Sequence, residues 1–205
     1  MTILLSSSET NDDMKIAITG GIGSGKSFVC REIERHGFRV YDCDAAAKRL
    51  MRTDEGLKAA LCRLVGDGVY DDGVLQKALL SRFLLASEAN KQAVNAVVHP
   101  AVARDYMESG LVWCESAILF ESRFDERVPF DKVVCVTAPV DVRLERVMRR
   151  DGISREKSLE WIEAQMPESE IVARSDWHIV NDGREDIPAQ VERLLQTVGL
   201  FGEQQ

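Results

Sequence analysis

The chain has 205 residues, 45% of them hydrophobic and 29% charged, and these proportions suit a globular protein with its own core. Its 26 Lys and Arg against 34 Asp and Glu give a formal net charge of −8, which argues against nucleic-acid binding through a broad basic face. No apolar run approaches the length of a membrane span and no two of the five cysteines form a CxxC pair, so we expect a cytoplasmic protein with reduced thiols and no membrane partner.

Residues 1–13 are expected to form a disordered tail, because Ser, Glu, Asn and Asp dominate their second half. The apolar stretch near the start follows no basic residue, so it does not have the pattern of a signal peptide. Met14 stands directly before the first expected strand and is an alternative initiator.

Strands and helices alternate along the rest of the chain. Short apolar or β-branched runs predict strands at residues 15–19, 38–41, 111–114, 132–137 and 177–180. Helical periodicity predicts helices over 24–36, over much of 44–108 with an interruption at His99–Pro100, after Pro139, after Ser154 as N-cap, and over 185–198. This alternation predicts right-handed βαβ units and a parallel sheet.

A glycine-rich loop lies between the first expected strand and the first expected helix. Residues Gly20–Ser27 read GGIGSGKS and match the phosphate-binding pattern GxxxxGK[ST] in full. Backbone N–H groups of such a loop and the helix N-terminus surround phosphate oxygens. Lys26 is expected to reach the β- and γ-phosphates, and the Ser27 hydroxyl to sit on Mg²⁺.

A loop of this kind occurs in switches, motors and kinases. The NKxD and DxxG patterns typical of a regulatory GTPase occur nowhere in the chain, and a motor would usually be larger. The small size, the long helical insertion and the arginine-rich helix after Pro139 favour a kinase of the nucleoside-monophosphate-kinase type. We therefore predict a three-layer α/β P-loop kinase core with a parallel sheet, a helical acceptor-binding insertion and a small lid.

Two carboxylates, Asp42 and Asp44, follow the second expected strand at the sheet edge where α/β proteins bind ligands. If the strand continues, both point to the same side; if Asp44 instead caps the next helix, they diverge. A carboxylate beside the γ-phosphate can orient and deprotonate an attacking hydroxyl. Helix capping is the structural alternative for both residues, and spacing alone leaves the choice open.

An ordered series of motifs resembles the dephospho-CoA kinase family. The matches run in order from Met14 to about Gly199. They begin with TGGIGSGKS at 19–27 and Val40–Asp44, which is similar to a DAD-type signature. Asn95–Pro100 is similar to N-x-[IL]-[IV]-HP, and Ile118–Glu121 to the last four residues of PLLFE. Arg146 and Arg150 fit R-x-x-x-R-D, and Gln165 with Asp176-x-x-Ile179-x-Asn181 resembles the later Q and D-x-[IV]-x-N-x-G signature. Many kinases share the loop alone, whereas the ordered set is specific.

The resemblance implies transfer of the ATP γ-phosphoryl group, with Mg²⁺, to the 3′-hydroxyl of the adenosine ribose of dephospho-CoA. The products are CoA and ADP, and this is the last step of coenzyme A biosynthesis. ATP and dephospho-CoA are the implied partners.

The resemblance also implies roles for individual residues. Asp42 is the candidate base, assisted in catalysis by Lys26 and Arg150. The candidate nucleotide-binding residues are Gly21, Ile22, Gly23, Ser24, Gly25, Lys26, Ser27, Phe28, Arg146 and Asn181. The candidate acceptor-binding residues are Asp44, His99 and Glu121. Ser27 and the Walker-B-like acid Glu115 are the candidate metal residues.

Three positions depart from the family pattern. Phe28 replaces the usual Thr, and since that position acts mainly through its backbone N–H, function is expected to survive. Ala117 replaces the Pro of PLLFE, and Glu115 replaces an Asp. His99–Pro100 has a structural alternative, a helix bend with a packed histidine, and the arginine-rich helix has another, a solvated face paired with acids.

The expected core domain is formed by three separate segments of the chain. The core comprises residues 14–43, 111–149 and 175–205, the acceptor-binding region 44–110, and the lid 150–174. Two other functions stay open: another small-molecule kinase of this fold, such as a nucleotide or shikimate-type kinase, and a nucleotide-binding switch that has no acceptor.

Overall fold

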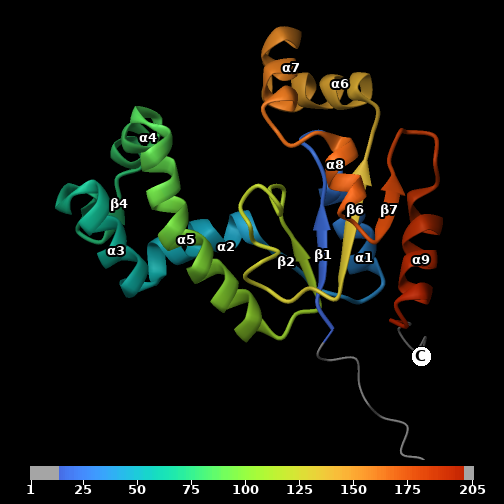
Figure 1. The fold of residues 1–205 in the computed structure, drawn as a ribbon, viewed down its shortest axis with the longest axis horizontal. Helices are drawn as coiled ribbons and strands as arrows, with labels where there is room; N and C mark the ends of the chain where they lie inside the picture. The colour runs from blue at the N-terminus through green and yellow to red at the C-terminus, as the bar shows by residue number, and fades with distance from the viewer. Residues whose placement is uncertain (1–13, 201–205) are drawn as a thin grey trace, which may run out of the picture.

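A computed structural model describes residues 14–200, and its centre is a five-stranded parallel sheet (Figure 1). The strand order is β2-β5-β1-β6-β7. The strands are β1 (Ile16–Thr19), β2 (Val40–Asp42), β5 (Trp113–Glu115), β6 (Lys132–Thr137) and β7 (Trp177–Val180). The predicted parallel sheet is confirmed, and the expected tail at 1–13 lies outside the described residues.

Both faces of the sheet are covered by helices, because alternate residues of each strand enter different cores. In β1, Ile16 and Ile18 belong to one buried cluster and Ala17 to the other. Helices α1 (Lys26–Arg35) and α9 (Ile187–Thr197) fill the first cluster. Tyr106 and Ile171 contribute to the second cluster from α5 and α8, respectively. The sheet thus lies between two helical layers, as predicted.

The segment between β2 and β5 is mostly helical and extends away from the sheet (Figure 1). Its elements are α2 (Cys43–Thr53), α3 (Glu55–Val65), the 3₁₀ turn η2 (Asp67–Val69), β3 (Tyr70–Asp71), β4 (Val74–Leu75), α4 (Lys77–Ala86) and α5 (Glu88–Ser109). The antiparallel β3–β4 hairpin was not predicted. The expected interruption at His99–Pro100 is wrong, since α5 continues through Pro100.

Helices α6 (Val140–Asp151) and α7 (Arg155–Glu163) pack on each other beyond the carboxyl ends of the central strands (Figure 1). Ser154 caps α7 as predicted, because its side chain accepts a hydrogen bond from the Lys157 N–H. Helix α8 (Glu168–Ala173) then returns to the sheet, and its Ile171 is buried in the core. No helix among residues 14–200 has the length and hydropathy to cross a bilayer.

The second strand is displaced from its predicted position. The sequence predicted 38–41, but β2 covers Val40–Asp42. The shift makes Asp42 both the last residue of β2 and the N-cap of α2. The capping alternative considered for Asp44 is therefore wrong: Asp42 is the cap, and Asp44 lies within the first turn of α2.

Candidate active site

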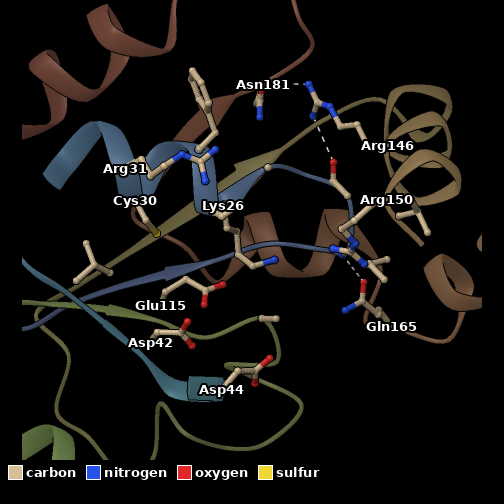
Figure 2. Close-up of a pocket in the computed structure, with 18 of the residues that line it drawn as sticks. Lys26, Cys30, Arg31, Asp42, Asp44, Glu115, Arg146, Arg150, Gln165 and Asn181 are labelled. Atoms are coloured by element: carbon tan, nitrogen blue, oxygen red, sulfur yellow. Dashed lines mark hydrogen bonds between the residues drawn. The ribbon is translucent and has the colours of Figure 1, made fainter. Parts of the chain in front are cut away.

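A pocket of about 910 Å³ opens at the carboxyl edge of the sheet, where the glycine-rich loop, β2, β5 and α6 converge. Figure 2 shows its arrangement. Lys26 lies centrally, with the carboxylates of Glu115, Asp42 and Asp44 on one side and Arg146 and Asn181 on the other. The pocket therefore has an acidic end and an end with amide and guanidinium groups.

Lys26 is the first residue of α1, and its side chain turns back into the loop. Its Nζ donates hydrogen bonds to the carbonyls of Gly20 at 2.7 Å and Gly21 at 3.3 Å. Burial lowers the pKa of Lys26, while the nearby Glu115 carboxylate opposes this shift. A buried ammonium that is held mainly by neutral carbonyls is suited to bind added negative charge.

Gly25 occupies a left-handed conformation with φ of 94°, which a side chain would strain. A Cβ there would also collide with the amide of Asn181. This explains why the last glycine of the motif is needed where the loop enters α1.

The three carboxylates of the acidic end come from adjacent elements. Asp42 and Glu115 are direct neighbours in the parallel pairing of β2 with β5, and Asp44 follows in α2. The Asp42 Oδ1 accepts the Ala45 N–H at 2.9 Å, so its second oxygen is not used in capping. Burial raises the pKa of Glu115, and Asp42 and Asp44 raise it further, whereas Lys26 lowers it.

At the opposite end, Arg146 and Asn181 hold the outside of the loop. Arg146 Nη1 donates to the carbonyls of Gly23 at 3.3 Å and Ser24 at 3.2 Å, and its Nη2 donates to Asn181 Oδ1 at 3.1 Å. The Asn181 amide donates to the Ser24 carbonyl at 2.8 Å. Arg150 also lines the pocket, and its guanidinium pairs with Asp151.

Two side chains outside the predicted site set also contact the loop. Gln165 accepts the Ile22 N–H at 2.6 Å, and Arg143 donates to the Ile22 carbonyl at 2.9 Å. Arg143 is buried and lies 3.6 Å from the Glu168 carboxylate. The family motif contained Gln165, but spacing along α6 did not distinguish the buried Arg143 from its exposed neighbours.

Most of the predicted site residues line this one pocket, and four do not. Gly21 and Ser24 belong to the loop but are not among the lining residues. His99 lies on α5, where burial, followed by Arg127, lowers its pKa. Glu121 accepts the Met166 N–H at 3.2 Å, which ties the loop after β5 to the segment before α8.

Comparison with known proteins assigns the family. The family model for dephospho-CoA kinase matches residues 14–186. The chain belongs to the dephospho-CoA kinase family. It is accordingly an ATP-dependent kinase, a transferase.

Individual relatives can be aligned with nearly the whole chain. A dephospho-CoA kinase from Bacteroides fragilis is 39% identical over 189 residues, covering 89% of this chain and 91% of the relative. One from Thermus thermophilus is 38% identical over 197 residues, covering 93% of this chain and 92% of the relative. The crystal structure of TT1252 from Thermus thermophilus superposes with a TM-score of 0.76 at 35% identity, covering 90% of this chain and 97% of the other.

The pocket of this dephospho-CoA kinase family member contains oxygen donors that suit Mg²⁺. The Ser27 hydroxyl and the Glu115 carboxylate both line it. Mg²⁺ with a nucleotide commonly takes only one or two protein oxygens, the remaining ligands being phosphate and water. Among residues 14–200 there is no group of three or more His, Cys, Asp or Glu side chains that would hold a metal ion, and such a group is not required here.

Proposed function

We propose that this chain phosphorylates the 3′-hydroxyl of dephospho-CoA from ATP. The observation that carries the proposal is the presence of Lys26, Asp42 and Asp44 in one pocket of about 910 Å³. A phosphate-binding loop that faces carboxylates across a pocket can bring a donor and a hydroxyl acceptor together. Family membership supports the identities of the donor and the acceptor.

In the proposed reaction, the acceptor 3′-oxygen attacks the γ-phosphorus and the bond from that phosphorus to the bridging oxygen breaks. Asp42 accepts the proton of the hydroxyl through the oxygen that does not cap α2. Lys26 leaves the carbonyls of Gly20 and Gly21 for the β- and γ-oxygens, where negative charge develops on ADP. The products are CoA and ADP.

Arg150 is proposed to neutralise phosphate charge after the lid closes, and Arg146 and Asn181 to hold the loop that binds the nucleotide. A Mg²⁺ ion bound with ATP supplies charge neutralisation at the phosphates. Ser27 and Glu115 are the residues that would hold this ion or its water shell.

Asp44, His99 and Glu121 are proposed to serve the acceptor side. Asp44 is the member of this set that lines the pocket. His99 and Glu121 do not line the pocket, and for Glu121 we propose an effect through the segment that it holds at Met166. We also propose a cytoplasmic location, consistent with five free thiols at Cys30, Cys43, Cys62, Cys114 and Cys135.

A substrate panel tests the proposal. The purified chain receives ATP and Mg²⁺ with dephospho-CoA, shikimate, a nucleoside monophosphate or no acceptor, and ADP release is measured. We expect rapid release with dephospho-CoA alone, and its loss in Lys26→Ala. Rapid release with another acceptor would assign a different kinase of this fold, and slow release unaffected by any acceptor would indicate a switch.

A further inference from the structure

The two ends of the pocket carry different chemical groups, and this difference indicates how a nucleoside triphosphate would lie in it. Asp42, Asp44 and Glu115 are gathered at one end and Arg146 with Asn181 at the other, on opposite sides of Lys26 (Figure 2). If Lys26 contacts the terminal phosphates and the attacked phosphorus faces Asp42, the remainder of ATP extends toward Arg146 and Asn181. This orientation rests on the proposed function.

Phe28 lies on that second side. It is on the first turn of α1, one turn after Gly25, and its N–H donates to the Gly25 carbonyl at 2.9 Å. The space beside Gly25 is filled by the Asn181 amide, and Phe28 and Asn181 both line the pocket. That N–H, through which position 28 was expected to act, is engaged within the helix in this structure, and the side chain is also open to a ligand.

The Phe28 side chain is open to solvent. It is 40% exposed, and of the described residues that line the pocket it is the only aromatic one. The Arg31 guanidinium, which also lines the pocket, lies 5.8 Å from the ring centroid, within the range of a cation–π contact. This contact places the ring and the guanidinium side by side at the pocket.

We propose that the Phe28 ring, positioned by Arg31, stacks on the adenine of the donor ATP. An exposed aromatic ring presents a planar apolar surface, and stacking of a base on such a surface stabilises nucleotide complexes. The adenine of dephospho-CoA does not compete for this ring, because its own ribose carries the attacked hydroxyl and lies at the acidic end. Phe28 thereby contributes to the recognition of the donor's base.

Calorimetric titration of three ligands tests the proposal: ATP, base-free inorganic tripolyphosphate, and dephospho-CoA. The variants are Phe28→Leu, which keeps an apolar side chain, and Phe28→Tyr, which keeps a ring. Leu85→Ala, on the exposed surface of α4 and away from the pocket, is the control. Phe28→Leu is expected to weaken ATP binding by about 5- to 100-fold, the effect of losing one base–aromatic stack.

The affinities for the other two ligands, and that of Phe28→Tyr for ATP, show whether the loss is specific to the adenine base. Tripolyphosphate and dephospho-CoA are expected to bind Phe28→Leu as they bind the wild type, and Phe28→Tyr to bind ATP within a few-fold. Unchanged ATP affinity in Phe28→Leu would overturn the proposal. Equal losses of affinity for ATP and tripolyphosphate would overturn it too, because the ring would then act by shaping the loop. A loss of affinity confined to dephospho-CoA would also overturn it, because the ring would then belong to the acceptor site.

The wild type separates this proposal from the proposed reaction. If it binds ATP more tightly than tripolyphosphate, and Phe28→Leu abolishes that preference, the stacking proposal holds even when dephospho-CoA is not phosphorylated. If dephospho-CoA is phosphorylated but the preference for ATP persists in Phe28→Leu, the stacking proposal fails and the proposed reaction stands.

Discussion

Asp42 has a structural role in addition to the catalytic role that we propose for it. Its Oδ1 caps α2 through the Ala45 N–H, while its position beside Glu115 exposes it to the pocket. Substitution by Asn preserves the cap, because Asn and Asp are nearly equivalent at an N-cap, but removes the proton acceptor.

We therefore expect Asp42→Asn to fold with nearly unchanged stability, bind both substrates and lose kcat by about 100-fold or more. Asp44→Asn should cost less, since Asp44 lies in the first turn of α2 without capping it. Steady-state kinetics and substrate titrations of both variants check this. An active Asp42→Asn beside an inactive Asp44→Asn would assign the base to Asp44 instead.

Glu115 is expected to make folding less favourable as pH rises. Burial raises its pKa in the folded chain, so the folded state holds this proton to a higher pH than the unfolded state. The stability associated with this group is present below its ordinary pKa and is lost as pH rises through the raised value.

Glu115→Gln should accordingly have a larger free energy of unfolding than the wild type at pH 8, with the difference shrinking as the pH approaches 4.5, while kinase activity falls. Urea denaturation across this pH range measures it. Asp67→Asn, at a surface turn outside the pocket, is the control. A difference that stays constant with pH would show that titration of Glu115 is not its cause.

At the scale of elements, we propose α7, together with the end of α6 from Arg150 onward, as the moving lid, because Arg143 and Arg146 tie the rest of α6 to the phosphate-binding loop. The proposed region 150–174 includes α8, but Ile171 of α8 is buried in the core, so we propose that the motion ends before it. Arg150 lies at the C-terminal end of α6, where it pairs with Asp151 and faces the pocket. Its phosphate contacts are expected to form only on closure.

Arg150→Ala should consequently lower kcat more than it weakens dephospho-CoA binding, because the lost contacts belong to the closed state. The comparison requires kcat and the acceptor Kd for the variant and the wild type. Arg193→Ala, on the exposed surface of α9, is the matched control and should leave both unchanged. Loss of acceptor affinity alone would place Arg150 in the acceptor site.

Trp161 provides a direct reporter of the lid. It lies on α7 and is 39% exposed, whereas Trp113 is fully buried in the sheet. ATP with dephospho-CoA should change the tryptophan emission of the wild type, because closure changes the solvent around Trp161. The change should disappear in Trp161→Phe. If it persists there, it arises from Trp113 or Trp177, and α7 is not shown to move.

Across the whole molecule, the sequence predicted strand positions best where burial of apolar side chains alone determines the structure. The strand predicted at 132–137 matches β6, since a continuous apolar run buried between helices has few alternatives. The prediction at 177–180 also matches β7, an edge strand of which only Ile179 is buried. The β3–β4 hairpin was missed because its two-residue strands are too short for periodicity to register.

The motif-based part of the site was more predictable than its supporting contacts. The loop motif and the carboxyl edge bring Lys26 and Asp42 into one pocket, as local rules suggest. Arg143, however, acts through a hydrogen bond to Ile22, which is 121 positions away, and no local pattern identifies such a partner. Similarly, Asp42 rather than Asp44 is the N-cap of α2, because β2 ends one residue later than its apolar pattern indicates.

The central claim, that this chain joins ATP to an acceptor hydroxyl, is tested most directly by following the γ-phosphate itself. ATP labelled in that group is incubated with the chain, Mg²⁺ and dephospho-CoA, and the products are separated. The label is expected in CoA, at the ribose 3′-position, with ADP formed in equal amount, and transfer should be nearly absent in Lys26→Ala. Label that appears as inorganic phosphate, at a rate unaffected by dephospho-CoA, would contradict the account.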